Sequence, residues 1–301
     1  MTDERLFIFG YGNSSRATAQ RMAGRFATIS GTTRRPEKAE HMKAEGITPY
    51  LFDGTAPGAG IDEALAAATH VLVSIPPDEA GDPVLRHHGE ALAASGALKW
   101  IGYLSTIGVY GDHHGEHIDE TAECRATSAR AKRRLMAEAE WTALGAHAHV
   151  PVAILRLAGI YGPGHNVMTR LAAGKARRLV KPGQLFNRIH VADIAGLVDG
   201  AASHLAGGIF NGADDEAAPP QDVLVYAAEL MGITPPPEEP FETAELTPMA
   251  RSFYGETKSI SNEKARLELG WSPLYPTYRE GLSALWADGS WNATNDSEKK
   301  R

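Results

Sequence analysis

Apolar and polar positions form alternating blocks through the first half of the chain. Short apolar segments, typical of buried strands, are followed by longer segments whose apolar residues recur at helical spacing. The predicted strands are Leu6–Phe9, Thr28–Ser30, His70–Ser74, Trp100–Leu104, Val152–Leu157 and, further along, Ile209–Phe210. The predicted helices are Arg16–Phe26, Pro36–Glu45, Ile61–Ala68, Val84–Ala94, Ser128–Leu144 and, further along, Asn262–Leu269. This alternation predicts an α/β fold with right-handed βαβ units and a doubly wound, mainly parallel sheet covered by helices on both faces.

The pattern changes after Gly159. Residues 162–190 are rich in glycine, basic residues and loop signals. Residues 234–240 are dominated by proline and glutamate, so we predict a loop there. The polar and charged residues 291–301 are predicted to form a disordered tail.

Composition and charge exclude several classes of protein. Among 301 residues, 43% are hydrophobic and 22% are charged, as in an ordinary globular protein. The net charge of −7 and the lack of a basic face argue against a nucleic-acid partner. The single cysteine, Cys124, excludes an intrachain disulfide and a cysteine-based metal site. No run reaches the about 20 apolar residues of a membrane helix, and the N-terminus does not resemble a signal peptide, so we expect a cytoplasmic protein without a membrane partner.

A glycine-containing turn lies between the first predicted strand and the first predicted helix. A strand, such a turn and a helix, in that order, form the phosphate cradle of dinucleotide-binding folds. Gly10 permits a tight turn, and Gly12 lets backbone N–H groups approach a pyrophosphate at the positive end of the helix dipole. Ser15 stands where the usual fingerprint has its third glycine. The turn that we expect to bind the dinucleotide consists of Gly10, Tyr11, Gly12, Asn13, Ser14 and Ser15.

The loop at residues 112–117 contains three histidines and two acidic residues. It lacks the helical or strand spacing that a metal site needs. We interpret it as a flexible rim of the active site and predict no metal.

Four later segments carry a family resemblance. They are Leu104–Gly111, Leu155–Gly164, Arg188–Asp193 and Ile209–Gly212. Their order and spacing resemble the extended short-chain dehydrogenase/reductase family, which includes nucleotide-sugar epimerases and dehydratases. Within it, the chain is most similar to an atypical branch whose members resemble nucleoside-diphosphate-sugar epimerases, and the resemblance covers residues 5–285.

The resemblance implies a division of the chain into two parts. Residues 1–164 would form a Rossmann dinucleotide-binding domain, to which residues 189–212 return. Residues 165–188 and 213–290 would form a smaller part that binds a small-molecule substrate, a sugar or a sugar nucleotide. Homodimers are common in the family, so a homodimer is expected here.

The end of the second strand indicates which dinucleotide binds. An acidic residue there would bind the ribose hydroxyls of NAD. The chain instead has Thr33, Arg34 and Arg35. Because an arginine can bind a 2′-phosphate and a carboxylate would repel it, NADP is favoured over NAD. The alternative is that these arginines are solvated loop residues.

Other cofactor contacts follow from the resemblance. Asp53 matches the family position that contacts adenine. Ser74, Pro76 and Pro77 would flank the middle of the cofactor, although a plain turn also explains the two prolines.

The family's chemistry uses a Ser or Thr, a Tyr and a Lys, and the tyrosine is missing here. Thr106 matches the first position and Lys132 the last, while Ser128 stands where the tyrosine is expected. Ser128 and Lys132 would share a helix face. A serine hydroxyl is a far weaker acid than a phenol, so Ser128 is either an active-site hydroxyl or a helix N-cap. Lys132 is either a ligand of the cofactor ribose or a solvated surface residue.

Other residues are candidates for acid–base chemistry. Tyr161 lies on the loop that meets substrate in relatives, and we include it among the catalytic candidates. Tyr103 and Tyr110 are expected to be packing residues. His190 and Asp193 are expected to serve core packing and hydrogen bonding.

Arginine forks suit phosphorylated substrates. We favour Arg188 and Asn166 as substrate-binding residues. The alternative for each arginine is a structural ion pair. The other candidates are Arg156, Arg170, Arg177 and Arg178.

Two functional hypotheses remain. The first is an NADP-dependent oxidoreductase or epimerase-like enzyme that acts on a sugar or nucleotide sugar. The second, which rests on the missing tyrosine, is a dinucleotide-binding sensor or regulatory protein without turnover.

Overall fold

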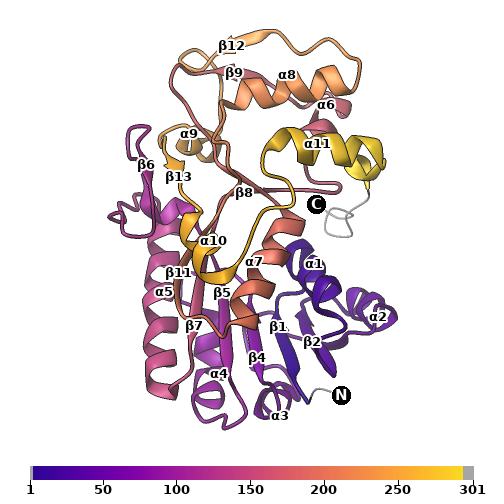
Figure 1. The fold of residues 1–301 in the computed structure, drawn as a ribbon, viewed down its shortest axis with the longest axis vertical. Helices are drawn as coiled ribbons and strands as arrows, with labels where there is room; N and C mark the ends of the chain where they lie inside the picture. The colour runs from indigo at the N-terminus through magenta and orange to yellow at the C-terminus, as the bar shows by residue number, and fades with distance from the viewer. Residues whose placement is uncertain (1–2, 294–301) are drawn as a thin grey trace.

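A parallel sheet of seven strands forms the centre of the computed structural model, which describes residues 3–293 (Figure 1). The strand order is β11-β7-β5-β4-β1-β2-β3, and each neighbouring pair is parallel. Most of these strands are almost continuously buried, as expected for a sheet covered on both faces. The strands are β1 Arg5–Phe9, β2 Thr28–Thr33, β3 Thr48–Leu51, β4 His70–Val73, β5 Trp100–Thr106, β7 Val152–Leu157 and β11 Gly208–Gly212.

Helices cover both faces of the sheet, and each face has its own apolar core. On one face Met22 of α1, Met42 of α2 and Leu197 of α7 pack with the sheet. On the other face Leu65 of α3 and Trp141 of α5 do so. The helices are α1 Asn13–Met22, α2 Pro36–Ala44, α3 Ile61–Ala66, α4 Pro83–Ala93, α5 Ala129–Ala148, α7 Val191–Ser203 and α10 Glu263–Leu269.

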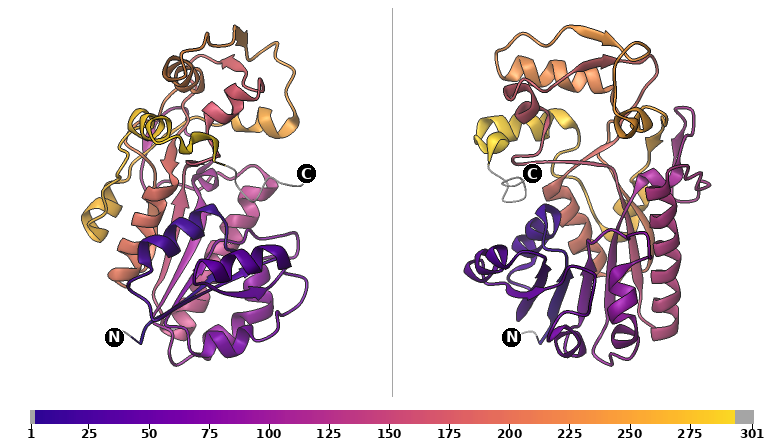
Figure 2. Two further views of the ribbon diagram at one scale, coloured as in Figure 1. Left: turned by 90° about the vertical axis from the view of Figure 1, so that its right-hand side faces the viewer. Right: turned by 180° about the vertical axis from the view of Figure 1, so that it is seen from behind.

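A smaller layer lies beyond the carboxyl edge of the sheet, at the top of Figure 1 and in both views of Figure 2. It contains two parallel strand pairs, β8 with β10 and β9 with β12. A third apolar core joins α6, α8 and α11. The elements are β8 Gly159–Tyr161, α6 Val167–Ala172, β9 Arg178–Val180, β10 Arg188–His190, α8 Pro220–Leu230, β12 Glu238–Pro240, α9 Pro248–Phe253, α11 Tyr278–Ala287 and the short 3-10 helix η2 Ser290–Asn292.

A further strand pair ties two distant parts of the chain together. The 3-10 helix η1 (Ile107–Tyr110) follows β5, and β6 (His117–Ile118) comes after it. β6 pairs in parallel with β13 (Ser259–Ile260). Within residues 3–293, no helix is long and apolar enough to cross a membrane.

The α/β class and the doubly wound parallel sheet predicted from the pattern are confirmed. Two local predictions are wrong. Glu238–Pro240, inside the predicted loop at 234–240, forms β12, because β9 presents an open edge with which it pairs. At the start of the predicted tail, Trp291 lies in η2, where its ring is 5.6 Å from that of Trp286. Residues 294–301 lie outside the described part.

Candidate functional site

The turn at Gly10 has the backbone geometry that a phosphate cradle needs. Gly10 has a φ of +86°, and a Cβ there would lie 2.9 Å from the Cγ1 of Ile75, so only glycine fits. Gly12 precedes α1 and has open space around it. No side chain of the described chain caps the first turn of α1 at Gly12. The first N–H groups of α1 therefore point toward the place where a pyrophosphate would bind.

Ser15 replaces the third glycine without disturbing this turn. Its side chain is fully buried, and its Oγ donates a hydrogen bond of 2.8 Å to the carbonyl oxygen of Gly10. The N–H of Gly10 donates to the Oγ1 of Thr32 at 2.8 Å. Asn13 is exposed and Ser14 half-buried at the start of α1. Ser15 thus adds a bond to the turn rather than opening it.

A cation and a carboxylate stand side by side where the adenosine end of a dinucleotide would bind. Arg34 follows β2 and is exposed, whereas Thr33 is buried. Asp53 follows the neighbouring strand β3 and accepts hydrogen bonds from the N–H and hydroxyl of Thr55 at 2.9 and 2.7 Å. These bonds, with a smaller contribution from the Arg34 guanidinium, lower the pKa of Asp53. Arg35 is half-buried beside them.

Sequence reasoning missed Lys38 at this end of the site. Its Nζ donates to the carbonyl oxygen of Tyr11, in the glycine turn, and lies 5.9 Å from the centre of the Tyr11 ring. A helix that begins at Pro36 places Lys38 in its first turn, close to the end of β2. That spacing was the signal available in the sequence.

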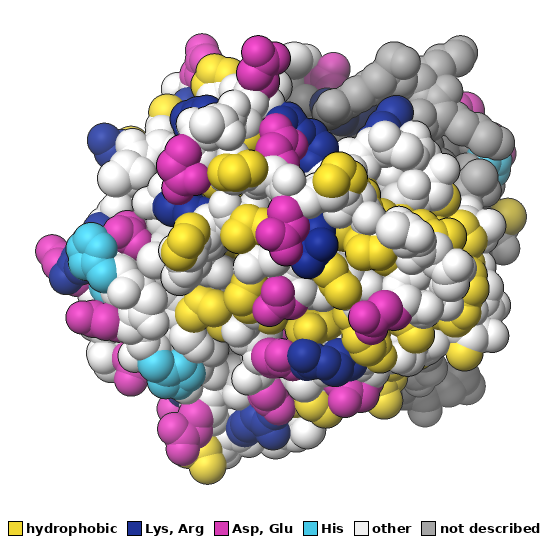
Figure 3. Space-filling model, turned by 90° about the horizontal axis from the view of Figure 1, so that it is seen from above, with side chains coloured by type: hydrophobic (Ala, Val, Ile, Leu, Met, Phe, Trp, Pro, Cys, Tyr) yellow, Lys and Arg dark blue, Asp and Glu magenta, His cyan; other side chains and the backbone are white. Residues whose placement is uncertain are grey.

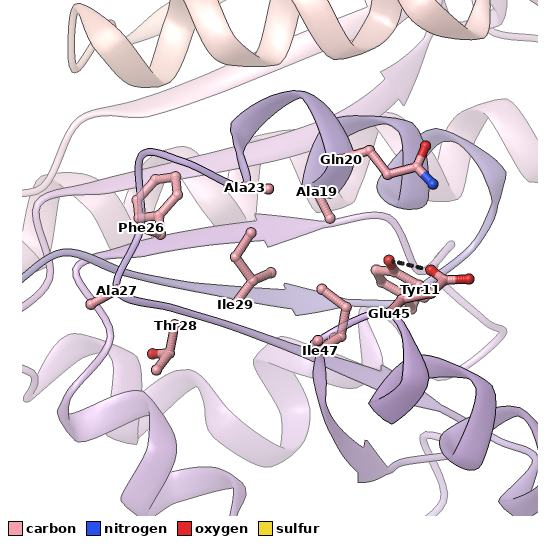
Figure 4. Close-up of a pocket in the computed structure, with 11 residues that line it drawn as sticks. Tyr11, Ala19, Gln20, Ala23, Phe26, Ala27, Thr28, Ile29, Glu45 and Ile47 are labelled. Atoms are coloured by element: carbon pink, nitrogen blue, oxygen red, sulfur yellow. Dashed lines mark hydrogen bonds between the residues drawn. The ribbon is translucent and has the colours of Figure 1, made fainter.

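The Tyr11 side chain anchors the turn to α2. It is buried over Gly31, and its hydroxyl donates to Glu45 at 3.0 Å, as the dashed line in Figure 4 shows. Glu45 also pairs with Arg16 of α1 at 2.7 Å. A groove of about 420 Å³ continues from this point between α1 and the amino ends of β2 and β3. It lies away from the carboxyl edge of the sheet and is therefore distinct from the cofactor position.

The middle of the cofactor would pass the ends of β4 and β5. The N–H of Ser74 donates to the carbonyl oxygen of Phe9 at 2.9 Å. Ser74 itself is half-buried at the edge of the sheet. Pro76 is exposed in the loop that follows. Thr106 ends β5, and its Oγ1 accepts a hydrogen bond of 3.1 Å from the N–H of Gly108. The Thr106 hydroxyl keeps its own proton free to donate.

Ser128 and Lys132 open α5, near the end of β5. Ser128 is the N-cap, and its side chain accepts a hydrogen bond of 3.2 Å from the N–H of Ala131. Lys132 is exposed one turn later. Between them, Arg130 lies over the ring of Phe253 at 5.2 Å, so the start of α5 touches α9 of the smaller layer. The capping interpretation of Ser128 is thus confirmed, and it does not exclude a second role for the hydroxyl.

Two arginines farther along α5, Arg133 and Arg134, are half-buried rather than exposed at the surface. Arg134 donates to the carbonyl oxygen of Leu104 at 2.6 Å and to the hydroxyl of Tyr103 at 3.3 Å. Arg133 is half-buried, and its Nε is shielded from solvent. The Arg134 side chain thus turns back toward β5 of the sheet.

The structure places Arg156 in the core, away from any substrate. It is 3% exposed and pairs with Glu138 of α5 at 2.7 Å. Glu138 also accepts a hydrogen bond of 2.5 Å from Ser105. The ion-pair alternative holds for this residue. Tyr103 and Tyr110 are fully buried, as predicted.

Tyr161 also lies in a core. Its ring packs in the cluster of α6, α8 and α11, and a Cβ on Gly281 would lie 2.0 Å from its hydroxyl. Burial, reinforced by Asp214 and Asp193, raises the pKa of Tyr161 above its ordinary value. This position makes Tyr161 a poor acid or base near neutral pH.

The polar groups of Asn166 are fully used inside the smaller layer. Its Oδ1 accepts hydrogen bonds from the N–H groups of Met168 and Thr169, which caps α6. Its Nδ2 donates to the carbonyl oxygens of Gly162 and Trp291, each at 2.9 Å. A side-chain amide has two donors and one acceptor oxygen, so this arrangement leaves no donor for a substrate.

The remaining candidate arginines divide into paired and available groups. Arg177 and Arg178 pair with Glu239 and Glu238, next to the β9–β12 pair. Acidic and basic side chains are accordingly interspersed on the face seen from above (Figure 3). Arg170 is exposed on α6.

Arg188 is half-buried at the start of β10. Its Nη1 donates to the carbonyl oxygens of Phe186 and Ala218 at 2.8 and 3.2 Å. Its guanidinium lies 5.9 Å from the centre of the Tyr278 ring. Burial lowers the pKa of Arg188. Of the candidate arginines, Arg170 and Arg188 are the two that no acidic side chain of the described chain holds in an ion pair.

The histidine-rich loop is docked rather than a free rim. The N–H of Thr257 donates to Asp112 at 2.8 Å, and His113 is buried with its Nε2 3.1 Å from the carbonyl oxygen of Glu123. His117 lies in β6. Among residues 3–293, no group of three or more His, Cys, Asp or Glu side chains is arranged to hold a metal ion.

His190 and Asp193 hold the start of α7, as predicted. The Nδ1 of His190 accepts from the N–H of Ala192 at 3.2 Å. Asp193 accepts from the N–H groups of Leu274 and Tyr275 at 2.5 and 3.3 Å. Burial lowers the pKa of His190 to about 4 and raises that of Asp193 to about 6.

The sheet order and the glycine turn define an α/β protein of the Rossmann type. The family model for the NAD dependent epimerase/dehydratase family matches residues 90–211. A reductase from Streptomyces sp., the 3-diazoavenalumate denitrifying reductase, is 30% identical over 157 residues, which cover 48% of this chain and 51% of that protein. The match thus spans about half of that relative.

Solved structures are similar over nearly the whole chain. A functionally unknown conserved protein from Silicibacter pomeroyi is 44% identical with a TM-score of 0.86, covering 95% of this chain and 99% of that chain. The UDP-glucuronic acid 4-epimerase from Bacillus cereus, solved with NAD, is 16% identical with a TM-score of 0.76, covering 96% of this chain and all (100%) of that chain. Residues 90–211 therefore match the NAD dependent epimerase/dehydratase family, and nearly the whole chain shares its fold with the Silicibacter pomeroyi protein.

Proposed function

We propose that the protein binds a nicotinamide dinucleotide at the Gly10 turn and uses it as an oxidoreductase or epimerase-like enzyme. The observation that carries this proposal is the turn itself. Gly10 is held in a conformation that requires glycine, and Gly12 leaves the N-terminus of α1 open. The Bacillus cereus epimerase, which shares the fold, was solved with NAD. The bound cofactor would supply or accept the hydride.

NADP is the preferred dinucleotide in this proposal. Arg34 and Arg35 follow β2, and Lys38 stands in the first turn of α2 beside the glycine turn. A 2′-phosphate there would meet positive charge from both elements. Asp53 would lie close enough to hydrogen-bond the adenine.

A cofactor titration tests the preference. NADPH should raise the melting temperature or quench the protein fluorescence at lower concentrations than NADH does. Arg34→Ala should weaken NADPH binding by about tenfold or more, the loss of one charge-assisted contact, and leave NADH nearly unchanged. Arg177→Ala, which removes an arginine far from the turn, is the control. A response to neither dinucleotide would refute the cofactor assignment.

The residues proposed to act at the nicotinamide end are Thr106, Ser128 and Lys132. Thr106 has a hydroxyl proton available to hold a substrate oxygen. Lys132 would bind the cofactor ribose, and its charge would lower the pKa of a nearby hydroxyl. The burial of Tyr161 leaves it outside this set.

The substrate proposed is a sugar or a nucleotide sugar. Arg188 and Arg170 support this because neither is neutralised by an acidic side chain in the described chain. Arginine forks bind phosphate or carboxylate groups well. We propose that residues 165–188 and 213–290 form the substrate-binding part, and that residues 1–164 with 189–212 form the dinucleotide-binding domain.

A sensor without turnover is the second candidate, and Ser128 favours it. A serine that caps a helix stands where the family places its tyrosine. A screen of nucleotide sugars with NADPH or NADP separates the two candidates. Turnover supports the enzyme, whereas tight cofactor binding without turnover on any member of the screen supports the sensor.

A further inference from the structure

Asp214 is a buried carboxyl group that no described side chain holds in an ion pair or a hydrogen bond. It follows β11, and 3% of its surface is exposed. Neither of its oxygens makes a hydrogen bond of normal geometry with a described residue. An ionised carboxylate in such surroundings is strongly disfavoured unless a charge or several donors meet it. The group therefore needs an explanation beyond packing.

A guanidinium stands close to this carboxyl group and is not used by it. The N–H of Asp214 donates to the carbonyl oxygen of Arg188 at 2.7 Å, so the two backbones are in direct contact. The Arg188 side chain nevertheless donates to the carbonyl oxygens of Phe186 and Ala218. A carboxylate would be a stronger acceptor than either carbonyl. This arrangement is the one expected when Asp214 carries a proton.

The other titratable groups around Asp214 do not neutralise it. The hydroxyl of Tyr161, on β8, is buried without a hydrogen-bonding partner in the described chain. On its own segment, Asp215 pairs with Arg266 and Glu216 pairs with Arg279. Burial raises the pKa of Asp214 to about 8, which Arg188 and the backbone at Glu216 offset only in part.

A second arginine, Arg170, acts together with Arg188 on the Tyr254 hydroxyl. Burial raises the pKa of the Tyr254 hydroxyl, and the guanidiniums of Arg170 and Arg188 both oppose that shift. Tyr254 packs on Phe186 with ring centres 5.2 Å apart. Arg188 of β10 and Arg170 of α6 thus both add positive charge to the surroundings of Tyr254, which favours an oxyanion such as a phosphate or a carboxylate.

We propose that Asp214 and Arg188 form a proton-controlled anion site. While Asp214 is protonated, Arg188 stays on the carbonyls of Phe186 and Ala218 and presents its remaining N–H groups to an anionic group of the substrate. When the proton leaves, the carboxylate binds the guanidinium and competes with that anion. Asp214 is thus a positioning residue for Arg188. The inference rests on the proposed function only in naming the substrate as the source of the anion.

The pH dependence of the stability of the folded protein tests whether Asp214 carries a proton. The pKa of Asp214 is raised in the folded state, so the folded protein holds a proton that the unfolded chain releases above about pH 4. The resulting stabilisation is complete below that pH and is lost as the pH rises toward about 8. The folding equilibrium constant should therefore fall by up to about tenfold per pH unit across this window.

Two variants isolate this contribution. Asp214→Asn should remove the part of the dependence of stability on pH that one proton causes. Asp222→Asn, which changes an exposed carboxylate in the first turn of α8, should leave that dependence intact. An Asp214→Asn protein with the same pH slope as the wild type would overturn the proposal. Because an amide cannot ionise, a general loss of stability in this variant would not mimic the loss of slope.

Binding of sulfate tests the control of the anion site. Sulfate keeps its charge between about pH 6.5 and about pH 9, on either side of the Asp214 transition. Titration calorimetry of the wild type should show about tenfold weaker binding at the higher pH, since about a tenth of the molecules would keep the proton. Asp214→Asn should bind sulfate equally at both values, and Arg188→Met should bind it at neither.

The outcomes separate this inference from the proposed function. Equal sulfate affinity at both pH values in the wild type would overturn the proton control while leaving Arg188 as an anion ligand. Sulfate binding to neither the wild type nor Asp214→Asn would overturn the anion site. The cofactor titration is independent of both, because Arg34 and Arg188 lie at opposite ends of the protein's proposed site.

Discussion

Exposed charge at the ends of β2 and β3 is the basis of the proposed cofactor preference. Arg34 and Asp53 follow neighbouring strands and lie close enough for the arginine to lower the pKa of the carboxyl group. In the proposed complex, Arg34 would be a cation for the 2′-phosphate and Asp53 an acceptor for the adenine amino group. Lys38 adds a second cation from α2. In this proposal, single residues at strand ends, rather than the sheet, would set the cofactor preference.

The role of Lys132 can be measured directly. It is exposed on the first turns of α5, one turn beyond Ser128. If it binds the cofactor ribose, Lys132→Ala should weaken NADPH binding by about tenfold, the loss of one charged hydrogen bond, and slow any turnover found. Lys43→Ala, which removes an exposed lysine of α2, is the control. Unchanged affinity and turnover in Lys132→Ala would remove this residue from the site.

Which polar residues reach the site could not be read from the sequence alone. Arg156 and Arg188 both looked available to a phosphate, but Glu138 lies opposite Arg156 and holds it in the core. Asn166 looked equally free, yet two helix N–H groups and two carbonyls use its amide. Such pairings depend on elements far apart in the chain. Residue type gives the chemistry, and the tertiary contacts decide where it is used.

At the scale of elements, the start of α5 carries a residue, Ser128, that caps the helix and is also a candidate for the active site. Ser128 caps this helix, and Arg130 in its first turn lies over Phe253 of α9. The hydroxyl that closes the helix therefore stands at the contact between the two layers. A change at Ser128 can affect the helix, the site or both.

Two substitutions at Ser128 separate these effects. Ser128→Ala should lower the free energy of unfolding by about 1 kcal/mol, because an N–H of the first turn loses its acceptor. Ser128→Asp should restore most of that stability, since aspartate is an equally good cap. If the residue only caps, turnover per folded molecule is the same in all three proteins. Loss of turnover in both variants would show that the hydroxyl itself takes part in the reaction.

The alternating pattern predicted most of the sheet because its strands are buried on both faces. β1, β4, β5 and β7 are short apolar runs, and such runs stand out between helices. β3 did not stand out because Thr48–Leu51 contains a proline and lies at the edge of the sheet, where its residues are half-buried or exposed. Among the described strands, β12 pairs with β9 alone. Its two glutamates and a proline carry no strand signal in the sequence.

At the scale of the molecule, two apolar cores enclose the sheet and a third supports the layer above its carboxyl edge. The layer meets the larger part through the β6–β13 pair and through Asp112 bonded to Thr257. A cofactor at the Gly10 turn would lie along the edge, with Thr106 and Lys132 beside it and Arg188 above. In this proposal the fold brings residues from both halves of the chain to one cofactor.

A crystal structure of the protein with NADPH tests this account most directly. We predict that the pyrophosphate lies on the N–H groups of residues 12–14, with the 2′-phosphate within hydrogen-bonding distance of Arg34. The nicotinamide should lie beside Thr106, with the ribose next to Lys132. A cofactor bound elsewhere, or bound at the turn with its 2′-phosphate free in solvent and its nicotinamide remote from Thr106, would contradict it.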